Sequence, residues 1–314
     1  MTQNKFTDGK FNRSDKTLDG SNRAYVNFEG LETLWFNTGT LCNIACKNCY
    51  IKSSPQNDSL VYLTLNDVKG FLRELSSDGH DTKQIGFTGG EPFMNPEIVS
   101  MTQICLQKGY QVLILTNAMR PMMRQKVKQK LLELNSSFGN QLNLRISLDH
   151  WSKASHDKER GKSSYDETLK GMRWLSENGL NMTIAGRALL TKPRENVRQE
   201  YSNLFAKHGF DIDAFNPSKT VLFPEMDETT DVPEITTSCW SILNKTPTDM
   251  MCSYSRMIVK RKGDRTPRVI ACTLLPYEPE FELGKTLQDA SKPVFLNHPH
   301  CAKFCVLGGA SCSA

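Results

Sequence analysis

The chain has 314 residues, of which 38% are hydrophobic and 23% are charged, so it is long enough to bury a sizeable core. Its formal net charge of +5 is spread among acidic residues, and the absence of any block of about five like charges argues against a nucleic-acid partner. No apolar run approaches about 18 residues, and the first residues lack the apolar core of a signal peptide. These features predict a cytoplasmic protein that does not engage a membrane.

Strand-like and helix-like stretches alternate along most of the chain, after a polar N-terminal segment. Residues 1–25 are rich in Asn, Asp, Lys, Ser and Gly and are predicted to be flexible. Apolar runs of strand character lie at residues 34–37, 84–88, 111–117, 143–149, 182–189 and 213–222. Stretches with helical spacing lie between them, at residues 65–75, 96–108, 122–134, 165–177 and 195–208.

This alternation predicts βαβ units with right-handed crossovers, and hence an α/β fold with a parallel sheet of about six units. Periodicity alone leaves an open barrel and a doubly wound sheet as alternatives. The alternation of strands and helices ends near residue 225, and the remaining residues include six cysteines and many prolines. We therefore predict a core domain over residues 26–225 and a smaller, cysteine-rich domain over residues 226–314 that a metal cluster stabilises.

Three cysteines with C-x3-C-x2-C spacing, Cys42, Cys46 and Cys49, follow the first predicted strand. In a reducing compartment, clustered cysteines indicate a metal site rather than disulfide bonds. Zinc usually takes four protein ligands, so this spacing favours an iron–sulfur cluster, with zinc as the alternative. Because cubane clusters are usually held by four thiolates, three would leave one iron able to bind a small molecule. Cys105, within a predicted helix, is assigned no function.

The second predicted strand ends in Gly89, Gly90, Glu91 and Pro92. Adjacent glycines let backbone approach a ligand without obstruction by Cβ, and a carboxylate beside them can accept hydrogen bonds from an ammonium group. Ligands of parallel sheets bind where the carboxyl ends of the strands meet. We therefore expect this segment to lie near the cysteine triplet.

In this order, the cysteine triplet and the Gly-Gly-Glu-Pro segment resemble the radical S-adenosylmethionine (radical SAM) superfamily. The resemblance implies a partial (β/α)6 TIM-like barrel in which the amino and carboxylate groups of SAM chelate the open iron. It implies that the segment from Gly89 to Pro92 receives the amino group. Further cofactor-binding candidates lie at the ends of later strands. Asn117 closes the third strand, as similar Thr-Asn pairs do in the family, and the resemblance places Ser147 and Asp149 near the ribose of SAM. Arg187 is expected to face the SAM carboxylate, with a structural ion pair as the alternative.

Some residues near these motifs differ from the family pattern or receive no catalytic role. The residue before the third cysteine is often aromatic in this superfamily, where it lies near the adenine, whereas here it is Asn48, followed by Tyr50. His150 and His156 come after the fourth predicted strand. We interpret both as loop histidines rather than proton donors.

The cysteines after residue 225 resemble the auxiliary-cluster domains called SPASM and Twitch. Cys252 and Cys272 bracket a predicted hairpin around Gly263, and a second group of cysteines closes the chain. The resemblance implies one auxiliary [4Fe-4S] cluster, with structural zinc as the alternative. The expected ligands are Cys252, Cys272, Cys305 and Cys312, and Cys239 and Cys301 are the alternative ligands.

The resemblance also implies a reaction. A radical SAM enzyme cleaves SAM reductively at its [4Fe-4S] cluster to methionine and a 5'-deoxyadenosyl radical, which abstracts a hydrogen atom from a substrate, here a peptide or a small metabolite. The electron would come from a reductant such as ferredoxin or flavodoxin. Two other functions stay open, a non-enzymatic iron–sulfur electron carrier and a zinc-stabilised binding module. The electron carrier would not need the Gly-Gly-Glu-Pro segment.

Overall fold

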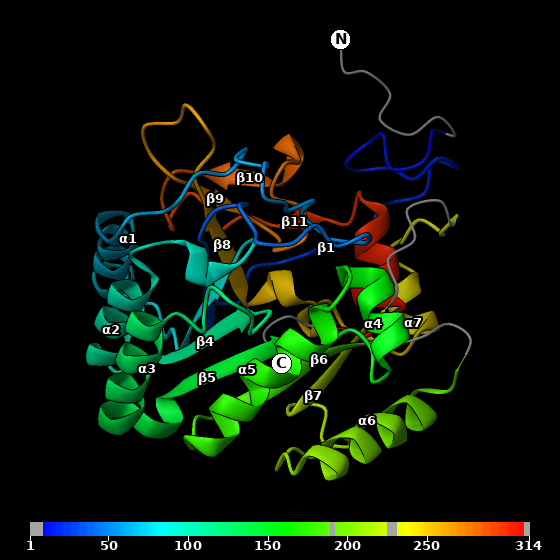
Figure 1. Ribbon diagram of the computed structural model, residues 1–314. Helices are drawn as coiled ribbons and strands as arrows, with labels where there is room; N and C mark the ends of the chain where they lie inside the picture. Colours follow the sequence, from blue (N-terminus) through cyan, green and yellow to red (C-terminus); the bar gives the residue numbers. More distant parts are fainter. Residues whose placement is uncertain (1–8, 189–191, 225–230, 311–314) are drawn as a thin grey trace.

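The computed structural model describes residues 9–188, 192–224 and 231–310. Nine strands form one sheet in the order β10-β9-β8-β2-β3-β4-β5-β6-β7, and β1 and β11 form a separate antiparallel pair (Figure 1). The strands are β1 (Tyr25–Val26), β2 (Thr33–Asn37), β3 (Gln84–Thr88), β4 (Gln111–Thr116), β5 (Leu142–Ser147), β6 (Met182–Ala188), β7 (Thr220–Pro224), β8 (Ser255–Val259), β9 (Arg268–Ile270), β10 (Glu282–Gly284) and β11 (Val294–Phe295).

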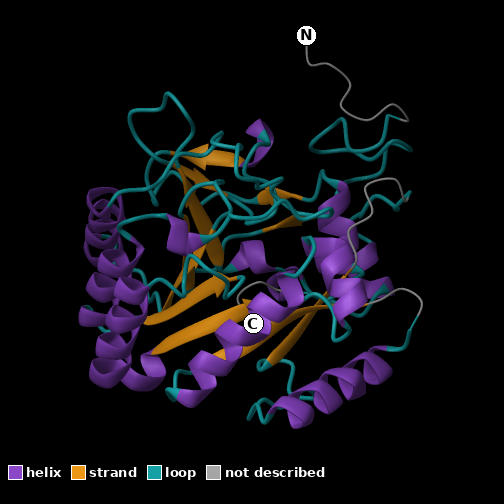
Figure 2. Ribbon diagram, viewed as in Figure 1, coloured by secondary structure: helices purple, strands orange, loops and turns teal. Residues whose placement is uncertain are grey.

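Six neighbouring strands, β2 to β7, run parallel, and helices connect most of them. The predicted α/β fold with a parallel sheet is therefore confirmed. The helices are α1 (Leu65–Ser77), α2 (Ile98–Gln107), α3 (Gln125–Phe138), α4 (Lys153–Arg160), α5 (Ser164–Glu177), α6 (Arg194–His208) and α7 (Cys239–Ile242). Figure 2 shows the long helices on one side of the sheet and mainly loops and short strands on the other.

Alternating side chains divide each parallel strand between two apolar layers. In β2, Leu34 and Phe36 pack with the helices, whereas Trp35 points into a second apolar cluster with the C-terminal residues. The register pairs Trp35 with Gly86 of β3, and a Cβ at Gly86 would lie 2.3 Å from the indole ring. The glycine therefore makes room for the largest side chain of the inner layer.

Two predicted elements begin later in the structure than expected, and one helix was not predicted. Helix α3 begins at Gln125 rather than at residue 122, because Arg124 has extended backbone and the preceding residues form a turn. Strand β7 begins at Thr220 rather than at residue 213, because Asp213 accepts hydrogen bonds from two following backbone N–H groups and starts a turn. Helix α4 was not predicted, and it begins after Ser152, whose side chain caps it. Residue 189, the predicted end of the strand here seen as β6, lies outside the described residues.

The C-terminal residues extend the main sheet. Strand β8 runs parallel to β2, with Thr33 opposite Ser255, and β9 and β10 add antiparallel strands at that edge. The predicted hairpin around Gly263 lies between β8 and β9, and this glycine has a φ of +91°. The boundary near residue 225 stays a prediction.

Part of the N-terminal segment is held against the rest of the chain. The Glu234 carboxylate accepts hydrogen bonds from the backbone N–H groups of Phe11 (2.7 Å) and Leu18 (2.6 Å), and it pairs with the buried guanidinium of Arg23 at 2.5 Å. These contacts anchor residues that the sequence predicted to be flexible. No helix in the described ranges is both long and apolar enough to cross a membrane.

Candidate functional site

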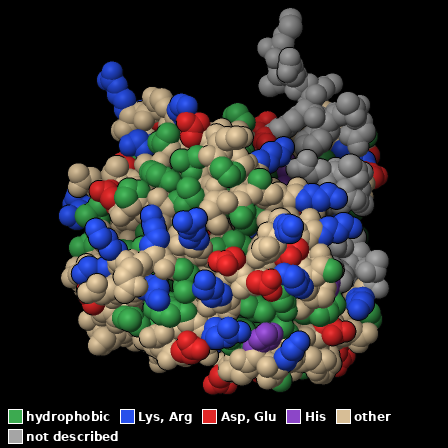
Figure 3. All heavy atoms as spheres, viewed as in Figure 1, with side chains coloured by type: hydrophobic (Ala, Val, Ile, Leu, Met, Phe, Trp, Pro, Cys, Tyr) green, Lys and Arg blue, Asp and Glu red, His purple; other side chains and the backbone are tan. Residues whose placement is uncertain are grey.

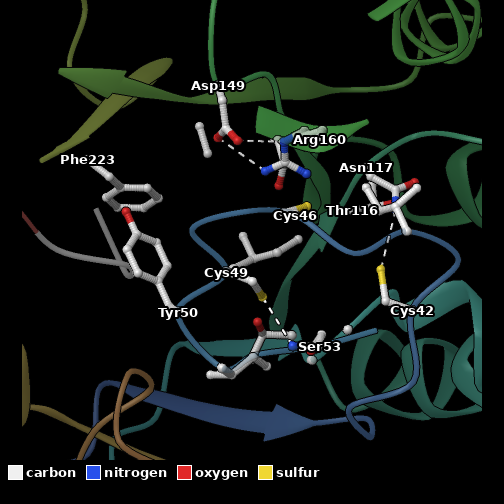
Figure 4. Close-up of a pocket in the computed structure, with 18 of the residues that line it drawn as sticks. Cys42, Cys46, Cys49, Tyr50, Ser53, Thr116, Asn117, Asp149, Arg160 and Phe223 are labelled. Carbon is white, nitrogen blue, oxygen red and sulfur yellow. Dashed lines mark hydrogen bonds and ion pairs between the residues drawn. The ribbon is translucent and has the colours of Figure 1, made fainter. Parts of the chain in front are cut away.

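A cavity lies at the carboxyl ends of the parallel strands, where the sequence predicted a ligand site. The three clustered cysteines, the two adjacent glycines and the polar ends of β4, β5 and β6 all line it (Figure 4). Of the predicted cofactor-binding residues, those lining the cavity are Gly89, Gly90, Asn117, Ser147, Asp149 and Arg187. Glu91 and Pro92 lie beneath this surface.

The cysteine loop places three thiols around the same space. The Cys42 sulfur lies near the Asn117 amide, the Cys49 sulfur accepts a hydrogen bond from Ser53 N at 3.3 Å, and Cys46 lies below the Arg160 guanidinium (Figure 4). Burial, followed by the charge of Glu91, raises the pKa of the Cys42 thiol to about 12. Burial also raises the pKa of Cys46. These thiols are therefore protonated until a metal or another cation stabilises the thiolates.

The donor set fits an iron–sulfur cluster. Soft thiolates select such clusters, and a cubane binds each thiolate through a different iron, so the sulfurs do not converge on one point. Gly89 and Gly90 line the same cavity as the thiols, so only backbone borders the cavity at these two positions.

The two glycines allow β3 to end directly against the cysteine loop. Gly89 has a φ of +140°, which only glycine adopts without strain. Gly90 N donates to Gly39 O at 2.8 Å, and Glu91 N donates to Leu41 O at 3.1 Å. A Cβ at Gly90 would lie 2.3 Å from the Leu41 carbonyl oxygen. The two sequence motifs are therefore joined by backbone contacts that tolerate no side chain at Gly90.

Glu91 has a different position from the one predicted. Its carboxylate is buried and accepts hydrogen bonds from Phe93 N (3.1 Å), Asn117 N (2.9 Å) and Thr116 Oγ1 (2.9 Å). Burial raises its pKa to about 7, although these hydrogen bonds oppose that shift. Rather than facing the cavity, the carboxylate connects the end of β4 to the turn after β3. Pro92 begins that turn.

Asp149 lies between two arginines at the edge of the cavity. Its carboxylate accepts hydrogen bonds from Arg160 at 2.7 and 3.1 Å and from Arg187 Nε at 3.3 Å. Burial alone would raise the pKa of Asp149, but Arg160 and then Arg187 hold it well below its usual range. Asp149 is therefore ionised at neutral pH, and two positive charges are fixed beside the cysteine loop.

Arg187 also contacts the cysteine loop directly. Its guanidinium donates to the Tyr50 hydroxyl at 2.9 Å and to the Asn48 carbonyl at 3.1 Å, and lies 4.6 Å from the centre of the Tyr50 ring. The Tyr50 ring meets Phe223 edge to face, with ring centres 6.4 Å apart (Figure 4). These aromatic rings form an apolar wall of the cavity.

Helix α4 supplies functional residues that sequence reasoning missed. Arg160, its last residue, lines the cavity, and Glu159 holds the cysteine loop from outside. The interpretation of His156 as a loop residue was wrong, because it lies within α4, buried against the Tyr165 ring. Burial lowers the pKa of His150 and of His156 to about 4, so both are neutral at pH 7.

The C-terminal cysteines that the structure describes lie in or against the inner apolar cluster, with Cys301 buried in it and Cys239, Cys252, Cys272 and Cys305 partly buried against it. Burial raises the pKa of Cys252 to about 11 and that of Cys301 to about 12, and the charge of a Cys252 thiolate adds to the second shift. The Cys272 sulfur accepts a hydrogen bond from Leu274 N at 3.3 Å. Cys305 lies on the helical turn Cys301–Val306. Cys312 lies outside the described residues, so the auxiliary ligand set stays a prediction.

Comparison with known proteins places this site in a family context. The family model of the radical SAM superfamily matches residues 36–196. The antilisterial bacteriocin subtilosin biosynthesis protein AlbA of Bacillus subtilis is 29% identical over 189 residues, which are 59% of this chain and 39% of AlbA. The Fe-coproporphyrin III synthase of Methanosarcina barkeri is 25% identical over 193 residues, 60% of this chain and 44% of that protein. The chain thus spans less than half the length of these relatives.

Two solved structures share the fold at low sequence identity. Streptococcus suis SuiB bound to S-adenosylmethionine superposes with a TM-score of 0.55 and 15% identity, covering 81% of this chain and 63% of SuiB. The AdoMet-bound anSMEcpe gives a TM-score of 0.56 and 13% identity, covering 82% of this chain and 76% of anSMEcpe. These likenesses confirm the predicted partial barrel.

Proposed function

Because the chain belongs to the radical SAM superfamily, we propose that Cys42, Cys46 and Cys49 hold a [4Fe-4S] cluster at which SAM binds and is cleaved. The observation that carries this proposal is the joining of the cysteine loop and the Gly89–Gly90 turn by backbone hydrogen bonds in one cavity. A non-enzymatic electron carrier would need the cysteines but would not need the Gly89–Gly90 turn beside them.

The chain's own residues prepare the cavity for a polar ligand. When bound, the cluster and SAM supply the radical chemistry, in which one electron breaks a carbon–sulfur bond and the resulting carbon radical takes a hydrogen atom from the substrate. The backbone at Gly89 and Gly90 allows close approach, and Arg160 and Arg187 offer positive charge toward a carboxylate. Apolar side chains keep the cavity dry: Trp35, Ile44, Ile51, Leu115 and Leu274.

Anaerobic reconstitution with iron and sulfide, followed by dithionite and SAM, tests this function. The wild type is expected to release 5'-deoxyadenosine, and Cys46→Ala is expected to release none. Cys105→Ala is the matched control, because Cys105 is buried in α2 away from the cavity. An electron carrier would change redox state without cleaving SAM, and a zinc module would bind no iron. Full activity of Cys46→Ala would refute the assignment.

We further propose that the substrate is a peptide or protein. Three similar proteins are named for peptides: AlbA for subtilosin, SuiB for its precursor peptide SuiA, and anSMEcpe for a bound Cp18Cys peptide. The edge-to-face pair of Tyr50 and Phe223 suits a side chain of such a substrate. A peptide substrate would raise 5'-deoxyadenosine release above the rate without substrate. A response to a porphyrin alone would instead favour the reaction type for which the Methanosarcina barkeri relative is named.

The second proposed centre is one auxiliary [4Fe-4S] cluster on Cys252, Cys272, Cys305 and Cys312. Its support is the packing of three of these cysteines, Cys252, Cys272 and Cys305, against one apolar cluster, together with the likeness to SuiB and anSMEcpe. Iron analysis after reconstitution is expected to give about eight irons per chain, and about four after Cys252→Ala. Zinc in place of the second iron set would support the structural alternative.

A further inference from the structure

A second depression lies on the other side of the cysteine loop from the cavity. It has a volume of about 830 Å³, which is far larger than one bound ion needs and allows several side chains of a partner to enter. We call it the basic groove. It is lined by residues of the cysteine loop, of the segment after β4, and of the end of α4 and start of α5: residues 43–45, 119, 120, 123, 124, 160–164, 167 and 170.

The basic groove carries an excess of positive charge. Arg120, Arg124, Lys162 and Lys170 are exposed, and none of them forms an ion pair with a described residue. Glu167 is the one acidic residue among those that line the groove. Over the face seen in Figure 3, Lys and Arg side chains are interspersed with Asp and Glu. The groove therefore attracts a partner of negative charge.

The basic groove also borders the loop that carries the thiols. Residues 43–45, which form its wall, are the residues between Cys42 and Cys46. Ile44 lines both the groove and the cavity, and so does Arg160. A protein seated in the groove is thus separated from the cysteine cavity by one thickness of the loop.

We propose that the basic groove is the docking site of a small acidic electron-carrier protein. The proposal rests on the proposed function and names the partner that supplies its electron. Charge complementarity would steer the carrier to the groove, and the thin loop would bring its redox centre close to the cluster. In the step itself, the carrier loses one electron and the cluster gains it. No bond forms or breaks, and no proton moves.

Charge reversal in the groove, with oxidised flavodoxin as the probe, tests the proposal. The double variant Lys162→Glu/Lys170→Glu places two acids on the α5 side, and Arg120→Glu changes the opposite wall separately. The matched control is Lys207→Glu/Lys219→Glu, which makes the same change of charge at exposed positions outside the groove. Unchanged thermal unfolding of each variant shows that it is folded.

Two measurements decide the result. Binding of flavodoxin to the metal-free chain is expected to weaken about tenfold in both groove variants, and added salt is expected to weaken wild-type binding. In the reconstituted enzyme, 5'-deoxyadenosine release driven by reduced flavodoxin is expected to fall about tenfold, while release driven by dithionite is unchanged. The control is expected to match the wild type in both measurements.

Other results would overturn the proposal. Equal weakening in the control would mean that net charge, not the groove, attracts flavodoxin. Undiminished binding in the groove variants would place the carrier elsewhere. If the groove variants bound flavodoxin normally but no longer bound an acidic peptide, the groove would be assigned to the substrate. If they lost only the binding of inorganic phosphate, the groove would be assigned to a small anion. If the wild type released no 5'-deoxyadenosine with dithionite, the proposed function would fail, and the binding measurement would still judge the groove.

Discussion

Asn48 and Glu159 form a two-point contact between the cysteine loop and helix α4. Asn48 N donates to one Glu159 carboxylate oxygen at 2.9 Å, and Asn48 Nδ2 donates to the other at 2.9 Å. Lys47 N also donates to the Glu159 backbone carbonyl at 2.8 Å. Asn48 occupies the position that is often aromatic in the superfamily, so this chain uses hydrogen bonds there to hold the loop between its second and third cysteines.

We expect Glu159→Gln to loosen this part of the loop. The amide offers one acceptor where the carboxylate offers two, so one donor of Asn48 is left facing an NH2 group. Hydrogen bonds to a charged group contribute about 1.5–3 kcal/mol, which corresponds to at least about tenfold in an equilibrium. The reconstituted variant should therefore lose iron to a chelator about tenfold faster than the wild type, as followed by absorbance.

A double-mutant cycle with Asn48→Ala tests whether this contact is the cause. If it is, the double variant should lose iron no faster than the more affected single variant. Lys158→Gln is the matched control, because Lys158 is an exposed neighbour on the same helix. Fully additive rates in the double variant would show that Glu159 acts through another contact.

The parts of the fold that local patterns encode could be predicted from the sequence. The apolar run of β3, residues 84–88, is followed at once by two glycines, and both features are visible without the structure. The spacing of Cys42, Cys46 and Cys49 likewise depends only on neighbouring residues. For this reason the α/β class and the family were correctly predicted.

The missed parts depend on residues far apart in the chain or on helices without an apolar stripe. Helix α4 has one buried side chain, His156, and apart from Ala154 its other residues are charged or polar, so no periodic signal marks it. The place of Arg160 beside Cys46 follows from that helix and could not be predicted either. The pairing of β8 with β2 joins residues near 255 and 33, which no local pattern specifies.

The ion cluster at Asp149 predicts a pH-dependent stability. Its pKa is lowered in the folded chain, so its contribution is fully present above the unfolded pKa of about 3.9 and is lost as pH falls through the lower folded value. Asp149→Asn leaves Arg160 and Arg187 without their shared counter-charge and should reduce the free energy of unfolding by about 3 kcal/mol at pH 7.

Urea unfolding of the metal-free chain measures this effect. The difference between wild type and Asp149→Asn should be constant from about pH 8 to pH 5 and should narrow below about pH 4. Asp211→Asn is the control, because Asp211 is exposed and is expected to change stability by less than about 0.5 kcal/mol. A difference that grows as the pH falls would contradict the assigned direction of the pKa shift.

The close approach at Gly90 predicts that an added methyl group uncouples the two motifs. In Gly90→Ala, the new Cβ would lie 2.3 Å from Leu41 O and 2.7 Å from Thr40 O, so the cysteine loop or the end of β3 must move. Overpacking of this kind costs about 1–3 kcal/mol, and the displaced loop should bind less iron on reconstitution. Urea unfolding and iron analysis give the two readouts.

Gly70→Ala provides the comparison for this substitution. Gly70 lies within α1, where an added Cβ meets no atom within 4 Å, and alanine there should stabilise the chain by about 0.5–1 kcal/mol. Iron content should stay at the wild-type level in Gly70→Ala and fall in Gly90→Ala. If Gly90→Ala instead bound iron normally and unfolded like the wild type, the backbone contact with Leu41 would not position the cysteine loop, because a rigid contact at that distance cannot accept a methyl group without moving.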